Sequence, residues 1–255
     1  MTQGIQSIQR GFALLRIVSA RNDTGVSLGE VTEISGLTRS TAHRIINALI
    51  EEHFIERHPG TKRYHLGLEF FSLGSSFSQR HNLQDIARPA MLKLAEITGD
   101  TIFLSIRSGD DAVCIARIEG TYPIKALTLS VGSRRPLGIG AGSLALLAAL
   151  DDNVIHEIYD RNPSRMESYS GADREDLFKF VSDTRSRGYS LNDGRIIQGM
   201  SAIGVVILDQ HSEPLAALSI AAISKRLPPD KRVHYFHRLV EARDLIVRRL
   251  GERPI

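Results

Sequence analysis

The chain contains 255 residues, of which 42% are hydrophobic and 24% charged, and its formal net charge is +3. This length suits one large or two ordinary domains, and the weak positive charge excludes a histone-like coat while leaving room for a local basic patch. Cys114 is the single cysteine, which excludes an intrachain disulfide and a CxxC metal cluster.

The first predicted element is an amphipathic helix near the N-terminus. Its apolar face is formed by Ile8, Phe12, Leu15 and Val18, and we expect this face to cover the core of a small domain. The opening residues Met1-Thr2-Gln3-Gly4 do not form a charged segment followed by an apolar core. We therefore expect no secretory signal and a cytoplasmic protein.

A helix, a glycine turn and a second helix are predicted next. Ser27 and Glu30 have the S-x-x-E spacing of a capping box, which satisfies two backbone donors and starts a helix. Gly36 ends this helix where the backbone must turn, and Thr38 is a suitable N-cap for the helix that follows. The second helix has one apolar side, formed by Ala42, Ile45, Ile46, Leu49 and Ile50.

The opposite side of this second helix is polar and has the reach needed to contact phosphates and base edges. An ordinary solvated helix face is the alternative interpretation. The preceding helix, the turn and a following hairpin, however, together fit the geometry of a helix that enters the DNA major groove. The predicted DNA-binding residues of this helix are Thr38, Arg39, Ser40, Thr41, His43, Arg44 and Asn47.

A basic hairpin is predicted directly after this helix. Residues 54–57 form a short strand, Pro59-Gly60 is a turn dipeptide, and residues 61–66 form the returning strand. Arg57, Lys62 and Arg63 cluster near its tip. Such a cluster alone is usually a solvated loop, but beside a DNA-reading helix we expect phosphate contacts. Residues 1–66 are thus predicted to form a winged helix-turn-helix domain.

Residues 67–82 are predicted to form a linker helix. Its apolar stripe comprises Leu66, Phe70, Leu73 and Phe77. The stripe belongs either to a connecting helix or to a surface shared with a second subunit, and the sequence does not separate the two. A protein that reads palindromic DNA needs a two-fold mate.

Residues 83–255 are predicted to form a separate α+β domain. The expected elements are a helix at 83–98, strands at 102–106, 112–118 and 124–129, helices at 141–161 and 172–186, strands at 202–208 and 215–221, and a helix at 230–250. Strands joined by short turns, with helices grouped elsewhere, favour an antiparallel sheet flanked by helices. Cys114 lies in one of these strands, where we expect a buried small side chain and not a reactive thiol.

The whole chain resembles the IclR family of bacterial transcriptional regulators. The similarity rests on five segments in order: GLTRSTAHR at 36–44, YHLG at 64–67, VGSRRPL at 131–137, RGY at 187–189 and PLAALSI at 214–220. The resemblance implies a winged helix-turn-helix, a linker helix and a GAF-like effector domain. It also implies a homodimer or dimer of dimers, palindromic or pseudo-palindromic double-stranded operator DNA as one partner, and a small organic acid or related catabolic metabolite as effector.

The resemblance places candidate effector-binding residues at Asn192, Ala202, Ser219 and Ala221. Family members that bind small polar acids often have Asp, Cys and Ser in place of Asn192, Ala202 and Ala221, so we expect a larger or more apolar effector, such as an aromatic acid. The glycine-rich turn before residue 144 adds Gly140, Ala141 and Gly142, because amides at a helix N-terminus can hold a carboxylate. The alternative is that these glycines only permit a tight turn.

An enzyme is the alternative function, but its usual motifs are absent from the sequence. The chain contains no G-x-S-x-G, H-E-x-x-H or P-loop, and His234 and His237 lie among cations without a carboxylate ligand nearby. We expect no catalytic residue, no cofactor, no metal and no membrane segment. A ligand-responsive DNA-binding regulator is preferred over a metabolite-binding protein or enzyme that carries an incidental helix-turn-helix.

Overall fold

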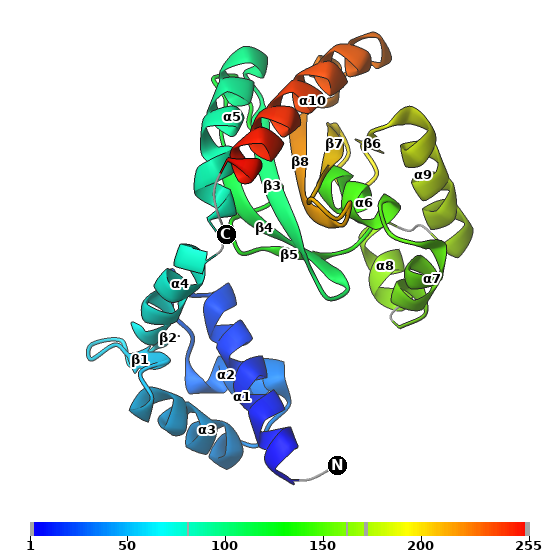
Figure 1. Ribbon diagram of the computed structural model, residues 1–255. Coiled ribbons are helices and arrows are strands. Elements are labelled where there is room, and N and C mark those ends of the chain that lie inside the picture. Colours follow the sequence, from blue (N-terminus) through cyan, green and yellow to red (C-terminus); the bar gives the residue numbers. More distant parts are fainter. Residues whose placement is uncertain (1–2, 81, 162, 171–172, 253–255) are drawn as a thin grey trace. The chain divides into compact units, whose positions relative to one another are not determined.

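A computed structural model describes residues 3–80, 82–161, 163–170 and 173–252 (Figure 1). The side chains of residues 3–4, 77–80 and 170 are also outside this description, and with them Phe77 of the predicted apolar stripe. The chain divides into two compact units, Met1–Asn82 and Leu83–Ile255. We call them the first and the second unit and describe each by itself.

The first unit is a three-helix core followed by a hairpin and a fourth helix (Figure 1). Its elements are α1 (Gln3–Ala20), α2 (Leu28–Ser35), α3 (Arg39–Glu51), β1 (Ile55–Arg57), β2 (Tyr64–Leu66) and α4 (Glu69–Arg80). β1 and β2 pair antiparallel, and Val26 forms an isolated bridge with Tyr64 beside them. The predicted winged helix-turn-helix is confirmed.

The local interactions that start and end these helices are those the sequence indicates. The amide of Glu30 donates to Ser27 Oγ at 3.3 Å, and the amide of Ser27 donates to the Glu30 carboxylate at 2.8 Å, which completes the capping box. Gly36 ends α2 with a φ of 66°, a left-handed conformation that suits glycine. Thr38 caps α3 by accepting from the Thr41 amide.

The buried face of α1 is rotated from the one predicted. Leu14, Leu15 and Val18 are buried in the core of the first unit, whereas Ile8 and Phe12 are 62% and 55% exposed. The predicted stripe is therefore divided between a buried and an exposed surface, because the face of α1 that packs in the core is centred on Leu14. The N-terminal half of α1 leaves its apolar side chains to solvent.

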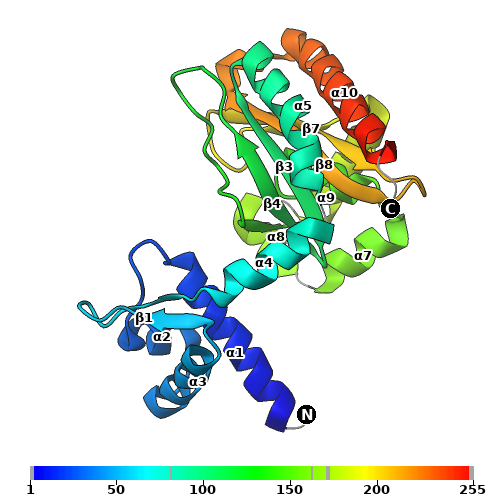
Figure 2. The same ribbon diagram turned by 60° about the vertical axis from the view of Figure 1, so that its left-hand side comes forward.

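The second unit is a six-stranded sheet with helices on both faces (Figures 1 and 2). Its elements are α5 (Leu83–Thr98), β3 (Thr101–Ser108), β4 (Asp111–Ile118), β5 (Arg134–Pro136), α6 (Ala141–Ala148), α7 (Asp152–Arg161), α8 (Pro163–Ser170), α9 (Arg174–Arg187), β6 (Ser190–Asp193), β7 (Met200–Leu208), β8 (Pro214–Ile223), a 3₁₀ turn (Ser224–Arg226) and α10 (Pro229–Gly251). The strand order is β5-β4-β3-β8-β7-β6, and every pairing is antiparallel. The predicted α+β class is confirmed.

Side chains alternate between the two faces of the sheet, as strand geometry requires. On β3, Ile102 and Leu104 enter the core beneath α5 and α10, whereas Phe103 lies with Cys114 and Ala221 in a cluster on the other face. Helix α6 packs on that other face against β7 and β8 (Figure 1). The sheet therefore has one fully covered face and one face that α6 covers in part.

Two predicted elements differ in the structure, and the strands β5 and β6 were not predicted. The strand predicted at 124–129 is part of a loop between β4 and β5, residues 119–133, and the third strand of this region is β5 instead. Of the apolar residues of this loop, Ala126 and Leu129 pack on the sheet, whereas Ile124, Leu127 and Val131 are exposed. Arg135 and Arg117 donate to the carbonyls of Thr128 and Leu129. The single helix predicted at 141–161 is two helices.

Two further findings concern the described residues as a whole. None of their helices combines the length and the apolar character that crossing a bilayer requires. Among the same residues, no group of three or more His, Cys, Asp and Glu side chains is placed to hold a metal ion.

Candidate functional site

A groove in the first unit lies between the start of α2, the N-terminal half of α3 and the tip of the hairpin. Its lining residues are Ser27, Leu28, Gly29, Arg39, Ser40, His43, Arg57, Thr61, Lys62 and Tyr64. Five of these were predicted to bind DNA: Arg39, Ser40, His43, Arg57 and Lys62. The lining of the groove includes three cations and no carboxylate. Its charge therefore favours a polyanion such as the phosphate backbone of a nucleic acid.

The exposed face of α3 continues away from this groove. Arg39, Ser40, His43, Arg44 and Asn47 are all exposed, while Ala42 and Ile46 on the opposite side are fully buried. The Asn47 amide lies 3.5 Å from His43 Nδ1, one turn away along this face. Thr38 and Thr41 instead bond each other at 2.9 Å at the helix start.

The hairpin tip presents Lys62 beside α3. The His58 ring accepts from the amides of Gly60 and Thr61, both at 3.2 Å, and Lys62 takes a positive φ of 59°. Arg57 Nε donates to the Lys62 carbonyl at 3.3 Å. The tip is therefore internally bonded, while the side chains of Arg57 and Lys62 remain exposed.

Arg63, which was predicted to contact phosphate, makes hydrogen bonds within the first unit. Its guanidinium donates to both Glu30 carboxylate oxygens, at 3.0 and 2.8 Å, and to the Gly25 carbonyl, at 3.1 Å from Nη2. This ion pair joins the returning strand of the hairpin to α2. We interpret Arg63 as a residue that fixes the position of the hairpin, because its Nε and Nη2 are already engaged within the unit.

The Glu30–Arg63 pair predicts an acid sensitivity of the first unit. Hydrogen bonds from Ser27, with those from Arg63, lower the pKa of Glu30 from 4.5 to about 2. A depressed carboxyl pKa stabilises the fold fully above about pH 4.5, and this stabilisation is lost as the pH falls toward 2. Glu30→Gln keeps a capping-box residue but removes the charge. We expect this variant to lose stability at pH 6 and to show a weaker decline in urea midpoint between pH 6 and pH 3. If the urea midpoints of the wild type and of Glu30→Gln fell in parallel between pH 6 and pH 3, this prediction would be contradicted.

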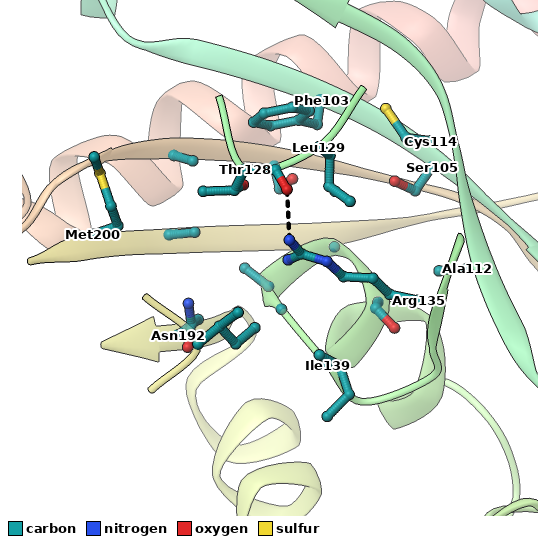
Figure 3. A pocket seen from close by; sticks show the side chains of 18 of the residues that line it. Phe103, Ser105, Ala112, Cys114, Thr128, Leu129, Arg135, Ile139, Asn192 and Met200 are labelled. Atoms are coloured by element: carbon teal, nitrogen blue, oxygen red, sulfur yellow. Dashed lines mark hydrogen bonds between the residues drawn. The ribbon is translucent and has the colours of Figure 1, made fainter. Parts of the chain in front are cut away.

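The second unit contains a cavity between its sheet and the start of α6 (Figure 3). All seven predicted effector-binding residues line it: Gly140, Ala141, Gly142, Asn192, Ala202, Ser219 and Ala221. The remaining lining residues were not predicted: Phe103, Ser105, Ala112, Cys114, Thr128, Leu129, Arg135, Ile139, Ser143, Ile196, Ile197, Met200 and Ser201. The structure thus brings together residues that are up to 118 positions apart, from Phe103 to Ala221.

Strand register explains how the sheet residues converge. Asn192 of β6 pairs with Ala202 of β7, which pairs with Ala221 of β8, so these three form one cross-strand row. In the neighbouring row on the same face, Ser219 pairs with Phe103 of β3. Strand side chains alternate between the two faces with a period of two. The four residues predicted from the family resemblance therefore lie on the same face of the sheet.

Helix α6 begins at this face without a side-chain cap. Gly140 precedes it with a φ of 92°, and no side chain caps its first turn. A Cβ at Gly142 would lie 3.3 Å from Ser219 Oγ, so glycine allows the first turn to approach the sheet closely. Uncapped amides at a helix N-terminus favour negative charge.

Arg135 is the charged residue among the lining residues that were not predicted. Its side chain points into the cavity and donates to the Thr128 carbonyl at 2.5 Å (Figure 3). Its neighbour Arg134 is exposed and pairs with Asp111 at 3.2 Å. The alternation of a strand separates the two arginines, but β5 was not predicted as a strand, so nothing in the sequence distinguished them.

Cys114 contributes a neutral side chain to the cavity. Burial raises the pKa of its thiol from 9.0 to about 11, so the thiol is protonated at neutral pH. This agrees with the expectation of a buried, unreactive cysteine. The cavity is accordingly a mixed site of apolar side chains, hydroxyls, one amide and one arginine.

Comparisons with known proteins identify both units. Residues 7–59 match the family profile described as "IclR helix-turn-helix domain", and residues 76–247 match "Bacterial transcriptional regulator IclR C-terminal". The transcriptional repressor IclR of Escherichia coli strain K12 is 28% identical over 250 residues, which cover 94% of this chain and 88% of that protein.

Solved structures agree in fold. An IclR transcriptional regulator from Alicyclobacillus acidocaldarius has a TM-score of 0.79 at 22% identity and covers 96% of this chain and 98% of its own. An IclR homologue from Microbacterium hydrocarbonoxydans, crystallised with 4-hydroxybenzoate, has a TM-score of 0.81 at 21% identity and covers 97% of this chain and 100% of its own. At this identity, the two structures establish the fold of this chain.

Proposed function

We propose, since the chain belongs to the IclR family of bacterial transcriptional regulators, that its first unit reads operator DNA and its second unit binds a small organic acid that controls this reading. The regulated genes are those of the catabolic pathway for that acid. The single observation that carries the proposal is the presence, in one chain, of a cationic groove beside an exposed helix and a separate cavity with one partly buried arginine. The matched profiles and relatives are regulators and not enzymes.

The proposed DNA contacts divide into two kinds. Arg39, His43, Arg44 and Asn47 lie on the exposed face of α3, where a helix in the major groove presents side chains to base edges. Arg57 and Lys62 at the hairpin contact the phosphate backbone, which positions the protein without reading sequence. Arg63 supports the hairpin through Glu30.

Self-association is part of the proposal, because two-fold symmetric DNA requires two copies of α3. Two sets of exposed apolar side chains in the first unit favour it: Ile5, Ile8 and Phe12 on α1, and Leu68, Phe71 and Leu73 at α4. Exposed apolar patches of this kind commonly mark interfaces. A homodimer, or a dimer of dimers, would cover them.

An organic-acid effector is supported by the cavity and by one structural neighbour. The neighbour holds 4-hydroxybenzoate, and in this chain the cavity offers a cation among apolar side chains. The cavity volume is about 50 Å³, whereas one water requires roughly 10–15 Å³. An aromatic acid would therefore enter only when the β4–β5 loop, which contributes Thr128 and Leu129 to the lining, moves outward.

The DNA-binding assignment is tested by contrasting Arg44 with Lys62. An operator is first selected from the DNA upstream of the gene that encodes this protein. Binding to it is then measured by gel shift at several salt concentrations. If Arg44 makes a bidentate contact with guanine, Arg44→Ala should weaken operator binding by roughly 5- to 150-fold and leave binding to unrelated DNA almost unchanged. Unaltered operator binding by this variant would show that the reading face is assigned wrongly.

Lys62→Ala is the matched control for that experiment. A phosphate contact carries no sequence information, so its loss should weaken operator and unrelated DNA alike. The slope of log affinity against log salt should also become shallower by about 0.9. A Lys62→Ala effect confined to the operator would contradict the assignment of the hairpin to the backbone.

A further inference from the structure

Arg135 is the one charged side chain of the cavity. Of the lining residues, all of which the structure describes, no other is ionised at neutral pH, because the Cys114 thiol is protonated. No carboxylate of the described chain lies within ion-pair distance of Arg135, although Arg134 beside it pairs with Asp111. A partly buried cation without a counter-charge is costly, and an anion bound beside it removes that cost.

The guanidinium of Arg135 has free donors directed at the start of α6. Nη2 donates to the Thr128 carbonyl, and within the described residues no acceptor is found for Nε or Nη1. Nη1 lies 3.7 Å from the position that a Cβ at Gly140 would occupy. The amides of Ala141, Gly142 and Ser143, in the uncapped first turn of α6, also have no acceptor in the part of the chain described.

The Arg135 guanidinium and the first turn of α6 therefore meet at Gly140, and neither has a negative partner among the described residues. A planar carboxylate could accept from the guanidinium fork and from the helix amides at once, which is the geometry that arginine favours over lysine. Burial lowers the pKa of Arg135, which reflects the same missing counter-charge. A glycine at 140 leaves open the space beside Nη1 that the carboxylate needs.

An unsatisfied polar atom lies elsewhere in the same cavity. The Oδ1 atom of Asn192 is buried and has no hydrogen-bond partner among the residues that the structure describes, and the residue as a whole is 8% exposed. Buried polar atoms without a partner are rare in folded proteins and point to a missing ligand or water. Because Asn192 lines the cavity, its carbonyl oxygen can accept a hydrogen bond from a hydroxyl of a bound molecule.

We propose that Arg135 determines the specificity of this cavity for hydroxy monocarboxylates: it binds the carboxylate against Gly140 and the start of α6, while Asn192 accepts a hydrogen bond from the hydroxyl. This proposal rests on the proposed function, and it adds the chemical class and the residue that selects it. One cation matches one negative charge, so a dianion would leave a charge buried without a partner.

The test compares two hydroxy acids with their neutral amides. Lactate, 4-hydroxybenzoate, lactamide and 4-hydroxybenzamide are titrated into the full-length wild-type protein, and binding is followed by thermal shift and calorimetry. We expect at least one acid to bind and its amide to bind much more weakly. Arg135→Met should reduce the affinity for the acid by roughly tenfold to a hundredfold and abolish the preference for acid over amide.

Arg117→Met is the matched control. Arg117 also holds the β4–β5 loop, donating to the Leu129 carbonyl at 3.0 Å, but it does not line the cavity. Its loss should lower the melting temperature of the protein alone while the preference for acid persists. If Arg135→Met does not fold, Arg135→Lys keeps the charge without the fork and should bind the acid more weakly but still in preference to the amide.

The outcomes distinguish the proposed role of Arg135 from the broader proposal that the second unit binds an organic-acid effector. Equal binding of acid and amide to the wild type, or full acid affinity in Arg135→Met, would overturn the role of Arg135 and leave an organic effector in place. Binding of neither acid to the wild type would overturn the proposal for hydroxy monocarboxylates and leave the broader proposal of an organic-acid effector in place. Loss of acid preference in Arg117→Met as well would assign the effect to the loop and overturn the role of Arg135.

Discussion

Replacing Asp100 by alanine is expected to lower the free energy of unfolding of the second unit by about 3 kcal/mol. Asp100 is 4% exposed and accepts from Arg226 Nε at 2.7 Å, from Arg226 Nη2 at 3.2 Å and from the Tyr235 hydroxyl at 3.0 Å. Its removal leaves a guanidinium and a phenol without their acceptor in a largely buried position. Urea denaturation followed by circular dichroism measures the loss.

Asp152→Ala is the control for this prediction. Asp152 also pairs with an arginine at 2.7 Å, Arg185, but its side chain is 65% exposed. Exposed ion pairs contribute at most about 1 kcal/mol, because water solvates both groups after the pair is broken. Equal losses of unfolding free energy in the two variants would mean that burial does not determine how much the Asp100–Arg226 pair stabilises the second unit.

The Asp100 cluster also bears on the cavity through the β4–β5 loop. Arg226 stacks on the Tyr122 ring at 4.0 Å, near the beginning of this loop, and Arg117 and Arg135 bond its carbonyls near the end. The loop contains no strand between residues 119 and 133. It is held by these arginine side chains and by backbone hydrogen bonds of Tyr122 with Gly99 and of Gly132 and Ser133 with Cys114.

The first unit shows how far short-range patterns can predict structure. The capping box at Ser27, the left-handed turn at Gly36 and the N-cap at Thr38 each involve residues within four positions, so the sequence contains all the information they need. The Arg63–Glu30 pair joins residues 33 positions apart. Short-range patterns predicted a phosphate contact for Arg63, because they do not reveal an ion pair with a residue so far away in the sequence.

The second unit shows where such patterns fail. Ile124 to Leu129 alternates in a way typical of a strand, yet this segment is a loop that contacts the sheet only through Ala126 and Leu129, because β5 takes the edge position beside β4. Arg135 enters the cavity only because β5 is a strand and Arg134 takes the opposite side. Family resemblance placed Asn192, Ala202, Ser219 and Ala221 together, but it could not place a residue whose orientation depends on an unpredicted strand.

Replacing Gly204 by alanine is expected to destabilise the second unit by about 1–3 kcal/mol and to weaken effector binding at the same time. A Cβ there would lie 3.0 Å from Ser190 Oγ and 3.1 Å from the carbonyl carbon and oxygen of Ala141. Ser190 donates to that Ala141 carbonyl at 2.6 Å. The added methyl group must therefore push the first turn of α6 away from the sheet, together with the amides proposed to bind the carboxylate.

Gly251→Ala provides the comparison, since no atom of the described residues lies within 4 Å of the added Cβ on α10, and alanine is favoured over glycine within a helix. Its urea midpoint and its acid-induced thermal shift should equal or exceed those of the wild type. If Gly204→Ala loses stability but keeps the full thermal shift with the acid, the position of α6 does not determine binding. The carboxylate would then depend on Arg135 alone, because the guanidinium is carried by β5 and stays in place when α6 moves.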